Sequence, residues 1–145
     1  MKRLFTAVAL VGSGAFAFDP ADLKKLNETN ECEGCNLSNA ELFNDDLTKA
    51  NLIGANLTDA NLTGANLTDA HLKTAYLHKA NLYKANLTGA NLTKAYLSEA
   101  NLREANLTWA NLTEANLWKA TLKEANLTKA NLHKANLTGA NLTKA

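Results

Sequence analysis

Hydrophobic and polar residues follow a fixed five-residue cycle from residue 35 onward. Leu stands at every fifth position from Leu37 to Leu142, which gives 22 repeats. Ala precedes each Leu by two positions except at Cys35 and Asp45, Asn directly precedes Leu in 16 repeats, and Ser or Thr follows it in 13. The consensus is A-N-L-T-x, where x is variable and often charged. A period this short indicates a repeat architecture.

The five-residue period fits neither an α-helix nor a straight strand. A helix turns by about 100° per residue, so successive Leu would be spread around the whole cylinder. A straight strand alternates its faces with a period of two, so successive Leu would lie on opposite faces. A chain that bends at a corner every five residues can direct all the Leu and Ala into a shared interior. Asn and Thr can then bond to the nearby backbone at the turns.

Charges at the last position of the repeat predict how many sides each coil has. Stacked neighbours lie about 4.8 Å apart, so opposite charges should face each other. At a separation of 20 residues there are eight opposite-sign pairs and one like-sign pair, against four and four at 15 residues and four and three at 25. The coil is therefore expected to hold four repeats, so that 22 repeats give about 5.5 coils. The opposite-sign pairs include Asp59 with Lys79, Lys79 with Glu99, Glu99 with Lys119, Lys94 with Glu114, and Glu114 with Lys134.

This run, from Cys35 to Ala145, resembles the pentapeptide-repeat family in its central Leu and in the Ala two positions before it. The resemblance implies an all-β fold, a right-handed quadrilateral β-helix. It also implies that Leu37 to Leu142 and Ala40 to Ala140 point inward. Some members of the family mimic the shape and charge of DNA and bind topoisomerases.

Residues 1–17 have the pattern of a secretory signal peptide. A short basic start is followed by a small apolar stretch that ends in Ala15-Phe16-Ala17, an A-x-A cleavage site. The alternative is a buried N-terminal strand or helix. Because the apolar stretch is too short to span a bilayer, we expect no stable membrane insertion after cleavage. The protein is expected in the periplasm or outside the cell, or in the thylakoid lumen if the source is cyanobacterial.

Residues 18–34 are expected to form a cap helix and a junction to the repeats at 35–145. Asp19 can serve as N-cap, Pro20 fits the first helical position, and the helix is predicted over about Pro20 to Glu28. Leu23 and Leu26, three residues apart, can cover the first coil with one face. Such a cover protects the unpaired backbone and the hydrophobic interior that an open β-stack exposes.

Cys32 and Cys35 stand at this junction, in a Leu position and an Ala position of the repeat register. In an exported protein the expected state is a disulfide that staples the first coil, and free thiols are the alternative. A zinc site would need two more ligands, and no His or Cys pair is near.

Catalytic and metal-binding patterns are not expected in this chain. His71, His78 and His133 fall at outward positions without ligand spacing. No nucleophile–base arrangement or carboxylate pair stands out from the repeat, and an interior filled with Leu and Ala leaves no pocket. We therefore expect no enzyme activity, no cofactor and no metal. The inward-facing Asp45 is the one unexplained polar position.

Two surface features depart from the consensus or extend it. Tyr76, His78, Tyr96 and Trp118 should share one side of the coil and form an exposed aromatic patch. Such patches serve recognition, although simple ladder stacking would explain the pattern as well. On another side, Thr residues flanked by Asn form a regular polar ladder that could bind ice or a crystal surface: Thr48, Thr68, Thr88, Thr108 and Thr128.

The leading functional prediction is a non-enzymatic, exported scaffold or protein-interaction module with an unidentified protein partner. It would use the aromatic patch or its open C-terminal coil, which could pair end-on with a second copy. DNA mimicry is disfavoured by the leader and by the near-balanced charge, 15 Lys+Arg against 14 Asp+Glu. The same balance argues against nucleic-acid binding.

Overall fold

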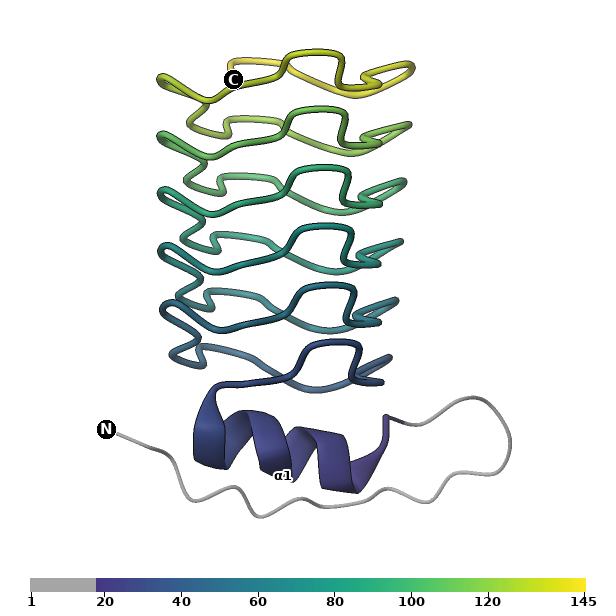
Figure 1. Ribbon diagram of the computed structural model, residues 1–145. Helices are drawn as coiled ribbons and strands as arrows, with labels where there is room; N and C mark the ends of the chain where they lie inside the picture. Colours follow the sequence, from purple (N-terminus) through teal and green to yellow (C-terminus); the bar gives the residue numbers. More distant parts are fainter. Residues whose placement is uncertain (1–17) are drawn as a thin grey trace.

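The computed structural model describes residues 18–145 as one helix followed by a four-sided coil (Figure 1). The predicted signal peptide at residues 1–17 lies outside the described residues. Helix α1 spans Pro20–Thr29, and the coil rises from it in regular, stacked turns. In the described part of the chain, no helix is long and apolar enough to cross a membrane.

The stacking register is 20 residues throughout the coil. Parallel β-bridges join single residues of adjacent turns, from Glu31 with Asn51 to Thr121 with Asn141. Each bridge falls on the residue before a Leu, so every side of a turn contributes only a very short β-segment. The prediction of four repeats per coil is confirmed.

A tight turn at the end of each repeat makes the corner. The second residue after Leu, called here the corner position, adopts a left-handed conformation, with φ of 55° at Lys79 and 59° at Glu99. The next Ala N–H then donates to the Leu carbonyl, as Ala80 does to Leu77 at 3.1 Å. On the other side of the Leu, an Asn often accepts from the backbone two residues on; Asn86 Oδ1 accepts from Thr88 N–H at 3.2 Å. These bonds explain why the chain bends every five residues.

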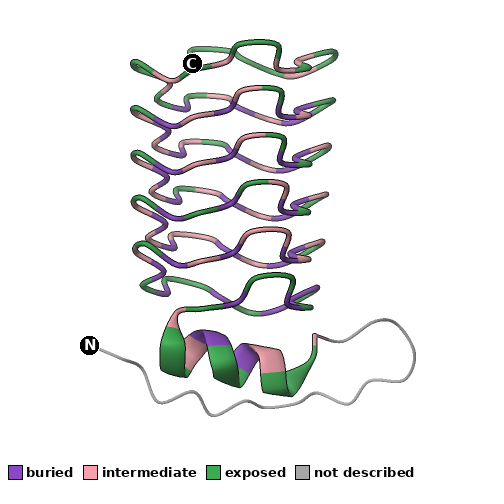
Figure 2. Ribbon diagram, in the orientation of Figure 1, coloured by how far each residue is buried: buried purple, intermediate pink, exposed green. Residues whose placement is uncertain are grey.

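The core is a single file of Leu and Ala inside the coil (Figure 2). All inward Leu and Ala from Ala50 to Leu122 are fully buried. Towards the C-terminal end this burial decreases: Leu127, Leu132 and Leu137 are only partly buried, and Leu142 is 40% exposed. Inward direction therefore does not guarantee burial in the last coil, because no further turn stacks on it in the structure.

Helix α1 covers the N-terminal end of the coil, as predicted, and is one residue longer than expected. Asp19 caps it by accepting from Ala21 N–H at 2.8 Å, and Leu23 and Leu26 are buried against the coil. The cap also bonds the free edge of the first turn. Asp22 Oδ2 accepts from Asn36 N–H at 2.7 Å, and Asp19 N–H donates to the Asn36 carbonyl at 3.0 Å. The edge that would otherwise expose backbone groups is thereby satisfied.

A disulfide links Cys32 and Cys35 directly above the cap, with their Cα atoms 5.1 Å apart. Both cysteines are buried and take inward positions of the first turn. Asp45, which replaces an inward Ala, is also buried at 7% exposure.

Most of the predicted charge pairs do not form ion pairs. Within residues 18–145, the pairs 20 residues apart that do so are Lys84 with Glu104 at 3.5 Å and Lys94 with Glu114 at 3.6 Å. The other predicted partners occupy stacked positions but stay apart, because an exposed ion pair gains little over hydration. These are Asp59 with Lys79, Lys79 with Glu99, Glu99 with Lys119, and Glu114 with Lys134.

Leu92→Asp should abolish cooperative folding, because it places a carboxylate in a fully buried position at a cost of several kcal/mol. Circular dichroism during heating measures the effect. Lys73→Asp, an exposed change on the same side of the coil, is the control and should leave the melting temperature nearly unchanged. A Leu92→Asp variant that melts like the unaltered protein would contradict this description of the core.

Asp22→Ala should lower the free energy of unfolding by about 1–3 kcal/mol, because it removes a charged acceptor from the Asn36 N–H. Urea denaturation checks the change. Lys25→Ala, on the exposed face of α1, serves as the control and should lie within about 0.5 kcal/mol of the unaltered protein.

Candidate functional site

One side of the coil, called here the aromatic side, carries Tyr76, His78, Tyr96 and Trp118. Tyr76 and Tyr96 are paired across adjacent turns, and their rings stack with centroids 5.0 Å apart and planes 7° apart. They remain 49% and 44% exposed. The two rings therefore cover one face of each other and leave their edges in solvent.

The outward position after Leu continues this side. His78 Nδ1 lies 2.9 Å from Ser98 Oγ, and Trp118 follows in the next turn with 37% exposure. Lys119 Nζ sits 4.2 Å from the Trp118 ring centroid, a cation–π contact. The structure thus brings the predicted patch residues together on three adjacent turns. Its core is uncharged and aromatic, as protein interfaces commonly are.

The threonine ladder is a chain of internal hydrogen bonds. Thr68 Oγ1 donates to Asn66 Oδ1 at 2.6 Å and accepts from Asn86 Nδ2 at 3.0 Å. The same arrangement recurs one turn later, where Thr88 Oγ1 accepts from Asn106 Nδ2 at 3.0 Å. Because these hydroxyl protons are already donated within the coil, the ladder has a structural explanation that needs no ligand.

A polar cluster surrounds Tyr83 on the next side. Arg103 Cζ lies 6.0 Å and Lys84 Nζ 5.1 Å from the ring centroid, which places the cation–π pair expected of Tyr83 and Arg103. Glu104 accepts from the Tyr83 hydroxyl at 3.3 Å and pairs with both cations. The hydrogen bond to Tyr83, and then the charges of Tyr83 and Glu104, raise the pKa of Lys84. These groups bind mainly one another.

Sequence reasoning missed two exposed aromatic residues. Trp109 is 59% exposed at a corner position, and Lys129 Nζ lies 4.2 Å from its ring centroid. Phe43 is 50% exposed after Leu42. A count of aromatic residues at all outward positions, corners included, would have found both. Neither has an aromatic neighbour in its own stack, so they do not extend the patch.

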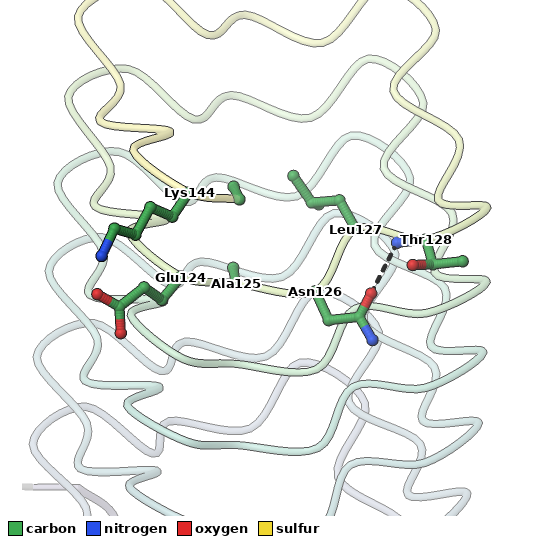
Figure 3. A pocket seen from close by; sticks show the side chains of 7 residues that line it. Glu124, Ala125, Asn126, Leu127, Thr128 and Lys144 are labelled. Atoms are coloured by element: carbon green, nitrogen blue, oxygen red, sulfur yellow. Dashed lines mark hydrogen bonds between the residues drawn. The ribbon is translucent and has the colours of Figure 1, made fainter.

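The C-terminal end of the coil holds an open hollow (Figure 3). Its lining is mixed in character: a charge of each sign, apolar carbons and backbone groups. The lining residues are Glu124, Ala125, Asn126, Leu127, Thr128, Lys144 and Ala145. The dashed bond in Figure 3, from Thr128 N–H to Asn126 Oδ1, is the same turn bond that recurs along the coil.

Titratable groups on the coil are scattered. Within residues 18–145 there is no group of three or more His, Cys, Asp and Glu side chains that could hold a metal ion. The pKa of Asp46 is lowered, first by the hydrogen bond from the Thr48 side chain and then by that from its backbone. This shift reports a local turn rather than a reactive centre.

Comparison with known proteins matches the repeats to a family model. The model, described as pentapeptide repeats, covers residues 35–73, 43–82, 70–108 and 105–143. A search of curated proteins found no significant match.

Several solved structures share the fold. A pentapeptide repeat protein (Rfr23) from the cyanobacterium Cyanothece 51142 is 31% identical, with 83% of this chain and 97% of that chain covered and a TM-score of 0.80. The pentapeptide repeat protein alr5209 from Nostoc is 40% identical over 52% of this chain and 62% of that chain, with a TM-score of 0.51. QnrB1, a plasmid-mediated fluoroquinolone resistance protein, is 21% identical over 68% of this chain and 60% of that chain, with a TM-score of 0.54, a likeness in fold alone.

The repeat, the stacking register and these matches agree with one another. The chain belongs to the pentapeptide-repeat family and folds as a right-handed quadrilateral β-helix.

Proposed function

We propose that this protein is an exported, non-enzymatic scaffold that binds other polypeptides through its aromatic side. The observation that carries the proposal is the exposed cluster of Tyr76, Tyr96 and Trp118 on one side of a rigid coil. Tyr and Trp are the residues that most often dominate binding energy in protein interfaces. Because Leu and Ala fill the coil, binding takes place on its outer surface.

Export is supported by the leader pattern at residues 1–17 and by the Cys32–Cys35 disulfide, since disulfides persist in oxidising compartments. The leader is expected to be removed after Ala17. Export also argues against DNA mimicry, which in this family acts on cytoplasmic topoisomerases and needs a strongly acidic surface. Residues 71–145 instead hold ten Lys and Arg against four Asp and Glu.

End-on pairing of two copies through the C-terminal coil is a second candidate. The partly exposed Leu127, Leu132, Leu137 and Leu142 favour it, because their burial would stabilise a contact.

The direction of the main-chain hydrogen bonds opposes that candidate. On each side of a turn, two N–H groups donate towards the C-terminal end and one towards the N-terminal end. Leu97 N–H and Glu99 N–H donate to the turn above at 2.7 and 2.8 Å, whereas Tyr96 N–H donates to the turn below at 2.9 Å. The last coil therefore presents two donors for each acceptor. Two such edges placed head to head are poorly complementary, so we rank the aromatic side first.

The protein isolated from an exporting host should begin at Phe18, because signal peptidase cleaves after the A-x-A motif. N-terminal sequencing and intact mass measure this. As a control, Ala17→Asp should block processing and leave residues 1–17 attached. Unprocessed chain in the cytoplasm of the host would contradict export.

Changing Tyr76, Tyr96 and Trp118 together to Ala should remove most partner capture from a periplasmic extract, because the exposed aromatic area is lost. Quantitative mass spectrometry of the captured proteins measures it. The matched control changes Phe43 and Trp109 to Ala, which removes exposed aromatic area from other sides. An unchanged set of partners for the triple variant would refute binding through the aromatic side.

A further inference from the structure

We propose that the aromatic side is self-complementary and binds a second copy of this chain in antiparallel orientation. This inference rests on the proposed function of the aromatic side as an interaction surface and names its partner. It is carried by an independent feature, the order of charges along the adjoining corner positions.

One corner residue per turn borders the aromatic side. Read from the N-terminal end, the sequence of charges is neutral, negative, positive, negative, positive, neutral. Reversing this order exchanges every negative position with a positive one and every neutral position with a neutral one. The residues are Asn39, Asp59, Lys79, Glu99, Lys119 and Gly139.

A twofold axis that lies in the interface and crosses the coil between Tyr76 and Tyr96 performs this reversal. It turns the second coil upside down but keeps each row of stacked residues opposite its own copy. Asp59 then faces Lys119 of the second copy, and Lys79 faces Glu99 of the second copy. Each contact occurs twice, as in any isologous interface.

These four charges are available for such contacts. All four side chains are exposed, and none forms an ion pair within residues 18–145. Lys84 and Lys94, on other sides, are already paired with glutamates of their own chain. The charges that border the aromatic side are thus the ones that the coil itself leaves unpaired.

The centre of the proposed contact suits burial. The two tyrosines lie on either side of the twofold axis, so Tyr76 of one copy meets Tyr96 of the other. The remaining outward residues on this side carry no acidic or basic side chain except His78, which is bonded to Ser98. An uncharged aromatic centre with charges at its border is the usual anatomy of a protein interface.

The other three sides lack this symmetry. Reversal of the row Lys49, Asp69, Gly89, Trp109 and Lys129 sets Lys49 against Lys129. In the row that ends at Lys134, reversal of its last five residues sets Lys94 against itself. In the row that ends at Lys144, Glu124 would face Gly64. The aromatic patch and the complementary charges therefore coincide on a single side.

The contact should be weak and salt-sensitive. A single side of the coil is roughly 25 Å long at the spacing of stacked strands, which keeps its area near the lower limit for specific interfaces. The charged contacts lie at the border, where salt screens them.

Sedimentation equilibrium of the purified protein over a range of concentrations tests the proposal. Lys79→Glu places like charges together at two symmetric contacts and should raise the dimer dissociation constant roughly tenfold or more. The exchange Lys79→Glu with Glu99→Lys restores opposite charges and should return the constant to within about threefold of the original. Restoration by the double variant cannot arise from damage to the fold.

Two control variants identify other modes of association. Lys94→Glu changes an equally exposed lysine on another side and should leave dimerisation unchanged. Leu142→Asp disrupts only the C-terminal end and should also have no effect. A protein that remains monomeric at millimolar concentration, a dimer indifferent to Lys79→Glu, or a dimer lost with Leu142→Asp would each overturn the proposal.

The outcomes also separate this inference from the proposed function. If partner capture depends on the aromatic residues while no dimer forms, the antiparallel dimer is wrong and the scaffold proposal stands. If the dimer responds to the charge exchange while capture is unaffected by the aromatic variant, the aromatic side serves self-association and the scaffold proposal in its general form is wrong.

Discussion

The main-chain hydrogen bonds between successive turns are the constraint on which the rest of this structure depends. Leu77 N–H donates to the Tyr96 carbonyl above it at 2.8 Å, and Tyr76 N–H donates to the Ala55 carbonyl below it at 2.9 Å. These bonds form only when a turn contains four repeats. One Leu per side then fills the interior at every level. Any outward residue is held above the residue 20 positions earlier, whatever its chemistry.

This constraint turns the surface into a regular grid, and the grid explains both the stability and the candidate site. Where neighbours suit each other, they stack, as Tyr76 and Tyr96 do. The stack stabilises the coil through one face of each ring and still presents the ring edges to solvent. Ladder stacking and recognition are therefore compatible uses of the same two residues.

The direction of the hydrogen bonds makes the two ends of the coil different. At the N-terminal end, Asp22 accepts from a free N–H group of the first turn, and Leu23 and Leu26 cover its apolar interior. The last coil has an excess of N–H donors and keeps Leu142 partly exposed. A partner for that end would have to supply acceptors, whereas the uncharged centre of the aromatic side suits a second aromatic surface.

The sequence by itself determined the period, the four-sided coil, the cap helix and the positions of Cys32 and Cys35. Each of these follows from which residues must be buried or must cap a backbone group. The tertiary structure alone decided that Lys94 pairs with Glu114 whereas Asp59 stays apart from Lys79, and that Trp109 is the most exposed of the large hydrophobic residues. A repeat fixes where each backbone position lies. The conformation of a solvated side chain depends instead on small energy differences among its immediate neighbours, which no periodic pattern specifies.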